Sequence, residues 1–223
     1  MKNQGGTEDQ ARKIPTHEVV YCQLRDMILF GQLAPGQPVT IQGLTDRLGA
    51  GMTPVREAIR KLIAENALEF QGNRRVSVPV LNLSQLHEIE FARSQIEPEL
   101  SRIACKSLTE NDISALRAVD AQVSLAIGAG DIQRYLLNNY RFHFALYELA
   151  RSPVLLSIAQ SLWLRFGPSL RIVCGRFGTS SLPDRHMDAL AAMEKRDCAA
   201  LAAAISQDIS QGISMVRLSL SDQ

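Results

Sequence analysis

Two short amphipathic segments between residues 44 and 66 form the most informative pattern of apolar and polar positions in this chain. Leu44 and Leu48 lie one helical turn apart, and the pattern then breaks at Gly49-Ala50-Gly51. In the segment that follows, apolar residues recur at helical spacing: Val55, Ile59, Leu62 and Ile63. Two short helices across a tight glycine-containing turn predict a helix-turn-helix, a unit that lays its second helix in the major groove of DNA.

The polar face of the second segment is basic. Arg56, Arg60 and Lys61 fall away from the apolar stripe, on the side where phosphates and base edges of DNA would lie. The same pattern also fits a helical hairpin whose basic face is simply solvated. The flanking elements favour the first interpretation.

Those flanking patterns predict a winged form of the unit. An amphipathic helix is expected over Thr16–Phe30, followed by a turn at Pro35-Gly36. Two short strands are expected at Leu68–Phe70 and Arg75–Val78, joined by a basic tip that contains a glycine. Three helices followed by a β-hairpin predict a winged helix-turn-helix over residues 14–79.

Residues 80–223 contain no strand-like alternation, and helical patterns follow one another. Their expected ranges are 84–106, 109–127, 131–150, 153–174, 183–195 and 197–219. Start signals lie at Thr109, three residues before Asp112, and at Ser152 before Pro153. Glycines mark the expected stops: Gly128, Gly130 and Gly175. The pattern predicts an antiparallel all-α bundle, whose 153–174 helix is apolar nearly all round and therefore central or at an interface.

Four of these predicted helices carry polar side chains within their apolar stripes. The residues concerned are Arg93, Asn139, His143, His186 and Asp208. Burying such groups is costly unless they pair with one another, with a metal or with a ligand.

Two explanations fit these inward polar groups. Each can be an ordinary hydrogen-bonded core residue, and Glu97, one turn after Arg93, is the obvious partner for an internal ion pair. Alternatively, two imidazoles, a carboxylate and an amide supply the nitrogen and oxygen ligands that suit Zn²⁺, Mn²⁺ or Ni²⁺. Arg93 would then face an anion beside the metal, because its planar fork suits bidentate pairing with a carboxylate.

The stretches ILFGQLAPGQPV and LTDRLGAGMTPVREAIRKLIAENALE, with the glycine-containing wing, resemble the GntR family of bacterial transcription regulators. The resemblance implies DNA contacts from Thr53, from Arg56 and from the wing around Gly72. The neighbouring basic residues Arg60 and Arg74 complete the expected DNA-binding set.

Three positions depart from the pattern of that family. Met52 stands where Arg is usual, Gly51 replaces the usual Ser at the helix N-cap, and Gln42 stands where many members have a stronger phosphate partner. Gly at an N-cap costs only a few tenths of a kcal/mol compared with Ser. We therefore expect the fold to be kept, whereas the base-recognition pattern of better-known members cannot be transferred.

The stretches FARSQIEPEL, NNYRFHFAL and RHMDALAAMEKRD, with the last helix, look like the FCD ligand-binding domain of the FadR-type subgroup. The resemblance implies a divalent metal held by Asn139, His143, His186 and Asp208. Asn139 stands where Asp is typical and Asp208 where His is typical, and an amide oxygen is a weak ligand. The resemblance also implies a small carboxylate effector, for which Arg93 and Asn139 are the expected contacts.

Composition and charge set further limits. The net charge is +1, and residues 1–80 carry ten Lys/Arg against eight Asp/Glu, so DNA binding must come from local placement and dimerisation. The cysteines are scattered and are expected to be reduced thiols rather than disulfides or metal ligands: Cys22, Cys105, Cys174 and Cys198. Without a membrane-length apolar segment or a signal-peptide core, we expect a cytoplasmic protein, and polar residues 1–13 are expected to be a disordered tail.

The expected function is that of a homodimeric regulator that binds a double-stranded DNA operator and responds to a small carboxylate. One alternative is a metalloenzyme that uses His143, His186 and Asp208, although the sequence offers no evident general base with a paired acid. Another is a dimeric ligand-binding paralogue that has lost DNA binding, an alternative suggested by Gln42 and Met52.

Overall fold

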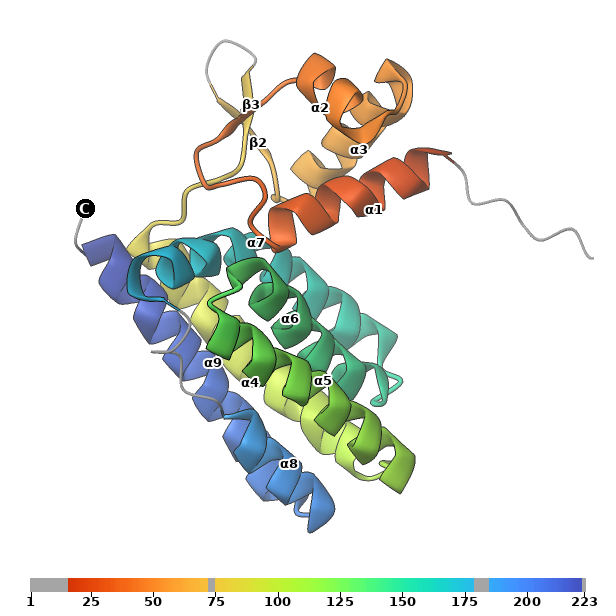
Figure 1. Ribbon diagram of the computed structural model, residues 1–223, viewed down its shortest axis with the longest axis vertical. Helices are drawn as coiled ribbons and strands as arrows, with labels where there is room; N and C mark the ends of the chain where they lie inside the picture. Colours follow the sequence, from red (N-terminus) through yellow and green to blue (C-terminus); the bar gives the residue numbers. More distant parts are fainter. Residues whose placement is uncertain (1–15, 72–74, 179–184, 222–223) are drawn as a thin grey trace, which may run out of the picture.

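The computed structural model describes residues 16–71, 75–178 and 185–221, and it is mainly helical (Figure 1). The expected tail at 1–13 lies outside these residues. The N-terminal elements are α1 (Thr16–Leu29), β1 (Pro38–Val39), α2 (Ile41–Leu48), α3 (Met52–Ala64), β2 (Glu69–Gln71) and β3 (Arg75–Ser77). The C-terminal elements are α4 (Leu83–Cys105), α5 (Glu110–Ala129), α6 (Ile132–Glu148), α7 (Pro153–Phe177), α8 (His186–Glu194) and α9 (Cys198–Ser221).

The predicted helix-turn-helix is confirmed. Helix α2 ends at Gly49, whose φ of 59° lies in the left-handed region, and α3 begins after the N-cap Gly51. The buried face of α3 is made by Val55, Ala58, Ile59 and Leu62. These apolar residues fix α3 against α1 and α2, so its opposite face is turned to solvent.

The wing is a three-stranded antiparallel sheet of order β1-β3-β2. Strands β2 and β3 form the predicted hairpin, with Phe70 opposite Val76. The sequence did not predict β1, in which Val39 pairs with Val76. A strand of two residues carries no alternation, so only its backbone pairing reveals it.

The C-terminal helices form the predicted bundle, with α4 packed along α9 and α5 along α6. The capping box of Thr109 with Asp112 is present, and Gly130 ends α5 with a φ of 67°. Two predicted stops are wrong: α5 continues through Gly128, and α7 continues through Gly175 to Phe177. A glycine inside a helix costs only about 1 kcal/mol, which tertiary packing outweighs.

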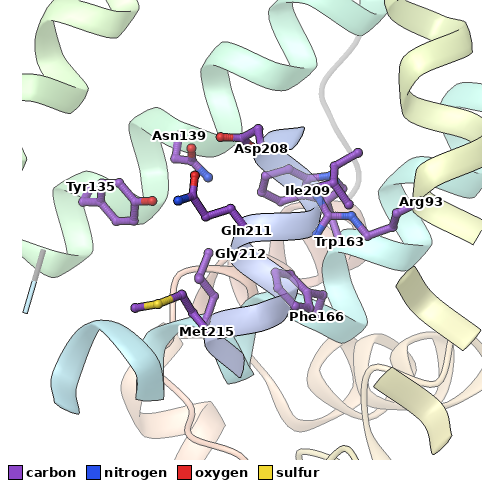
Figure 2. A pocket seen from close by; sticks show the side chains of 11 residues that line it. Arg93, Tyr135, Asn139, Trp163, Phe166, Asp208, Ile209, Gln211, Gly212 and Met215 are labelled. Atoms are coloured by element: carbon purple, nitrogen blue, oxygen red, sulfur yellow. The ribbon is translucent and has the colours of Figure 1, made fainter. Parts of the chain in front are cut away.

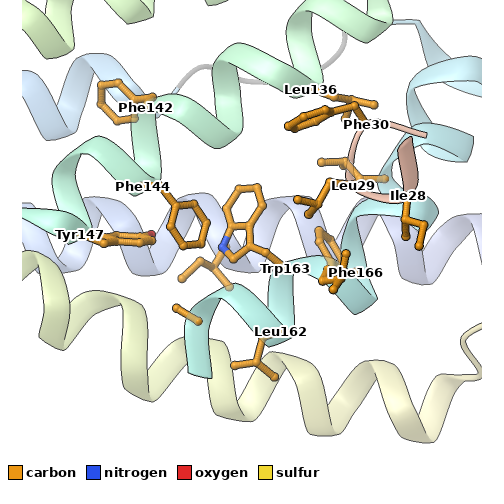
Figure 3. Close-up of a cluster of buried hydrophobic side chains, with 14 of the residues drawn as sticks. Ile28, Leu29, Phe30, Leu136, Phe142, Phe144, Tyr147, Leu162, Trp163 and Phe166 are labelled. Atoms are coloured by element: carbon orange, nitrogen blue, oxygen red, sulfur yellow. The ribbon is translucent and has the colours of Figure 1, made fainter. Parts of the chain in front are cut away.

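Helix α7 has the central position that its apolar sequence predicted. It packs against α4, α6 and α9 of the bundle and also against α1 of the DNA-binding part. Phe166 and Trp163 are buried in the cluster drawn in Figure 3, together with Leu29 of α1. A Cβ at Gly167 would lie only 2.7 Å from the backbone oxygen of Leu29, so the two helices meet in close contact there.

Two cysteines contradict the expectation of four reduced thiols. Cys105 at the end of α4 and Cys198 at the start of α9 form a disulfide, with Cα atoms 5.5 Å apart. Cys22 and Cys174 are free thiols. The two bonded residues are 93 positions apart, and the packing of α4 along α9 brings them together.

In the part of the chain that the structure describes, no helix combines the length and the apolarity needed to cross a membrane.

Candidate functional site

The solvent face of α3 is the candidate DNA-binding surface. Met52, Thr53, Arg56 and Arg60 are exposed on it, whereas the apolar stripe behind them is buried. The first turn contains no acidic residue, and the N-cap Gly51 makes no side-chain bond to the helix amides. The positive end of the helix dipole is therefore not neutralised at the end of α3 that a helix-turn-helix directs to DNA.

The basic residues of α3 differ in their partners. Arg60 pairs with Glu57 through Nη1 and Oε1, which are 2.9 Å apart. Lys61 lies over the ring of Tyr21, with Nζ 3.7 Å from the ring centroid. Arg56 is exposed and makes no ion pair with any residue that the structure describes. Arg56 is thus the cation of this helix most available to a phosphate or a base.

The wing is described only in part. Arg75, at the start of β3, is exposed, as are the residues of β2. The predicted contacts Gly72 and Arg74 lie outside the described residues.

Within the bundle, the structure brings together three of the predicted metal ligands from three helices. His143 lies on α6, His186 is the first residue of α8 and Asp208 lies on α9. One donor atom from each of them falls within 4.8 Å of the others. Both histidines are buried, with exposed fractions of 0% and 3%. Two imidazoles and a carboxylate at these separations match the donor set of a site for a first-row divalent metal.

Each imidazole of this cluster has a hydrogen-bonding partner at its Nδ1 atom. His143 Nδ1 lies 2.9 Å from the hydroxyl of Tyr147, and His186 Nδ1 lies 2.9 Å from Oδ1 of Asp120. The Nε2 atom of His143 lies 3.2 Å from Oδ2 of Asp208, but it makes no aligned hydrogen bond there and is buried. Holding a histidine through one nitrogen while the other is directed inward is the arrangement that proteins use around bound metals.

The protonation states also suit a cation. Burial lowers the pKa of His143, although Asp208 opposes this change. Burial alone would raise the pKa of Asp208, but His143, His186 and Arg93 outweigh it and hold that pKa below its usual value. A neutral His143 imidazole beside an ionised Asp208 carboxylate is the combination of forms that binds metal.

A narrow cavity of about 30 Å³ borders the cluster through Asp208. Arg93 and Asn139 line it, and so do Tyr135 and Gln211 (Figure 2). The amide oxygen of Gln211 is buried without a hydrogen-bond partner among the described residues. The cavity thus offers amide, hydroxyl and carboxylate groups against an apolar wall that includes Trp163, Phe166 and Met215.

Arg93 pairs with Glu97, the internal partner that the sequence offered one helical turn away. Its Nε and Nη2 atoms donate to Oε1 and Oε2 of Glu97, at 2.5 and 3.2 Å. Glu97 also accepts hydrogen bonds from Tyr147 and from Trp163 Nε1. The guanidinium lies over the Trp163 ring, 4.5 Å from its centroid. Arg93 therefore enters the cavity as half of a buried ion pair.

Asp120 and Tyr147, which hold the two histidines, were not predicted as site residues from the sequence. Both left a signal. Asp120 interrupts an apolar stripe of α5, and Tyr147 lies one helical turn after His143. Gln211 was also missed, because it follows Asp208 by three residues on a helix with many polar positions.

Similar proteins have the same two parts. Residues 16–78 match the bacterial regulatory proteins of the gntR family, and residues 88–211, more than half of the chain, match the FCD domain. The "HTH-type transcriptional regulator McbR" of Escherichia coli K12 is 29% identical over 191 residues, which cover 82% of this chain and 86% of that protein. The "HTH-type transcriptional repressor RspR" of the same strain is 26% identical over 215 residues, which cover 93% of this chain and 93% of that protein.

Solved structures agree with this assignment. The structure named "E. coli McbR/YncC" superposes with a TM-score of 0.87 at 26% identity and covers 92% of this chain and 99% of that one. A transcriptional regulator from Rhodococcus sp. RHA1, at 18% identity, shares the fold with a TM-score of 0.75 over 90% of this chain and 97% of that one. From these matches and the helix-turn-helix joined to a helical bundle, we conclude that the chain belongs to the FCD-containing, FadR-type branch of the GntR family and is a transcription regulator rather than an enzyme.

Proposed function

We propose that the chain acts as a homodimer whose operator affinity is controlled by a small carboxylate metabolite, bound with a divalent metal in the bundle. The observation that carries this proposal is the inward cluster of His143, His186 and Asp208 at the edge of a cavity lined by polar side chains. The residues proposed to touch DNA are Thr53, Arg56, Arg60, Gly72 and Arg74.

A Zn²⁺, Mn²⁺ or Ni²⁺ ion would be held by His143, His186 and Asp208, with Asn139 as a weaker oxygen ligand. The buried Nε2 atom of His143, which makes no aligned hydrogen bond, supports this fit. When bound, the metal would supply a positive centre that attracts a carboxylate. Because Arg93 is already neutralised by Glu97, we assign the main anion contact to the metal and a supporting role to Arg93 and Asn139.

The small size of the cavity supports coupling between the effector and DNA binding. At about 30 Å³ it is far smaller than the pockets of roughly 300–1,000 Å³ that hold drug-sized ligands, so a metabolite must displace lining side chains. Trp163 and Phe166 are among those side chains, and they belong to α7, which also packs against α1. An effector controls DNA binding only if its affinity differs between two conformations, and this displacement supplies such a difference.

The DNA-binding proposal is tested by selecting operators from a random pool of duplex DNA with the full-length protein. Arg56→Ala should weaken binding to the selected operator about tenfold, since such a contact contributes roughly 1–3 kcal/mol. Arg60→Ala is the matched control, because Arg60 is partly neutralised by Glu57, and its effect should be smaller. Equal affinities of the wild type and a folded Arg56→Ala dimer would exclude Arg56 from the interface. If no sequence is enriched, the paralogue without DNA binding is the better description.

The metal proposal is tested by elemental analysis after exposure to Zn²⁺, Mn²⁺ or Ni²⁺ and removal of the excess. We expect about one ion per chain in the wild type, and none in a helical His143→Ala/His186→Ala variant. A screen of small carboxylates by thermal shift, with and without the metal, then tests the effector. Stabilisation by an acid that does not require the metal would assign the anion contact to other groups of the cavity.

A further inference from the structure

Met52 is an apolar side chain at the tip of the proposed recognition helix. It is the first residue of α3 and 47% of it is exposed. In helix-turn-helix proteins the N-terminal residues of the recognition helix contact base edges in the major groove. Met52 is therefore placed where an apolar group would meet bases, beside the exposed Thr53 and Arg56.

Nothing at the start of α3 provides an alternative role for this side chain. Gly51 carries no side chain, and the first turn contains no carboxylate that would compete with DNA. An exposed thioether makes no ion pair with phosphate and is at best a weak hydrogen-bond acceptor, so a sequence-independent role on the backbone does not suit it. A contact with a base edge has to be apolar.

The major groove presents one common apolar group, the C5-methyl of thymine. The unbranched methionine side chain has three rotatable bonds and a polarizable sulfur, so it can adapt to such a methyl group. We propose that Met52 is a specificity-determining residue that selects thymine at one position of each operator half-site. This inference rests on the proposed insertion of α3 into the major groove.

The test removes the methyl group without changing base pairing. In the operator selected by the full-length protein, each thymine is replaced in turn by deoxyuridine, symmetrically in both half-sites, and dissociation constants are measured at fixed salt. At one thymine per half-site, we expect the replacement to weaken operator binding by the wild type about fourfold per contact. A loss of this size corresponds to one buried methyl-sized group. The same replacement should leave the affinity of Met52→Ala unchanged.

Two further variants sharpen the result. Met52→Leu keeps an apolar side chain and should keep the sensitivity to deoxyuridine. Met52→Arg should change the preferred base at that position from thymine to guanine, whose O6 and N7 atoms accept a bidentate Arg. Phe70, also apolar and 66% exposed but located on β2, is the matched control, and Phe70→Ala should leave the deoxyuridine effect as in the wild type.

The outcomes separate this inference from the proposed function. If an operator is enriched but every deoxyuridine replacement affects the wild type and Met52→Ala equally, Met52 does not read a thymine methyl, while DNA binding stands. If the random pool yields no enriched sequence, both proposals are overturned.

Discussion

Arg93 and Glu97 form a two-bond ion pair in the middle of the bundle, with side chains that are 3% and 0% exposed. Glu97 accepts two further hydrogen bonds, from Tyr147 and Trp163, and Tyr147 in turn contacts His143. A single buried carboxylate thus connects α4 to α6 and α7, next to the candidate metal site. The charge of Arg93 is needed first to balance Glu97.

We therefore expect Arg93→Met to be costly for folding. It leaves the Glu97 carboxylate buried without its cation, which typically costs about 3–5 kcal/mol. Arg93→Met/Glu97→Gln should recover much of this loss, because an amide oxygen can still accept from Tyr147 and Trp163. Denaturant unfolding measures both variants. Arg102→Met, which breaks the exposed pair with Glu99 on the same helix, is the control and should have little effect. Equal losses in the single and the double variant would show that the ion pair is not what stabilises this region.

Asp120 should act as a positioning residue for the metal. Its carboxylate holds Nδ1 of His186, so Asp120→Ala should lower metal affinity about 10–100-fold by releasing the ring. Titration with Ni²⁺ or Zn²⁺ against a competing chelator gives the affinity. Asp188→Ala alters a carboxylate that is 59% exposed on α8, paired with Arg185, and should leave the affinity as in the wild type. Identical metal affinity in a folded Asp120→Ala protein would rule out this orienting role.

The disulfide between Cys105 and Cys198 should make stability depend on reductant. Closing a loop of 93 residues restricts the unfolded chain and contributes about 4.7 kcal/mol in the chain-entropy view. We expect a lower thermal midpoint in the presence of a reductant, and the same lower midpoint for Cys105→Ser under either condition. Cys22→Ser, which removes an exposed free thiol, should behave as the wild type does. A wild type that is insensitive to reductant would show that the bond does not persist in solution.

Gly167 should be essential for the contact between α7 and α1. Gly167→Ala places a methyl group 2.7 Å from the Leu29 oxygen, so one helix must shift, at a cost of about 1–3 kcal/mol. We expect lower stability and altered operator affinity, measured by denaturation and DNA titration. Gly128→Ala, in a helical position with nothing within 4 Å, should instead stabilise the protein slightly. An Ala variant at residue 167 with wild-type stability and affinity would mean that this contact is dispensable.

The sequence by itself determined the two-part architecture, because the relevant signals are local. The apolar spacing in α3 and the left-handed Gly49 before it specify a helix-turn-helix without reference to the rest of the chain. The capping box at Thr109 fixes a helix start in the same way. Local signals failed where tertiary contacts competed with them: Gly175 lies inside α7, and β1 exists only through its pairing with β3.

The candidate site shows the same difference between local and tertiary information. His143, His186 and Asp208 were predictable as inward residues, since each interrupts an apolar stripe. Which groups meet across helices was decided by the tertiary structure. Asp120 reaches His186 from α5, and Cys105 at the end of α4 meets Cys198 at the start of α9. Helical periodicity specifies the direction in which a side chain points, but the partner that it meets depends on how separate helices pack.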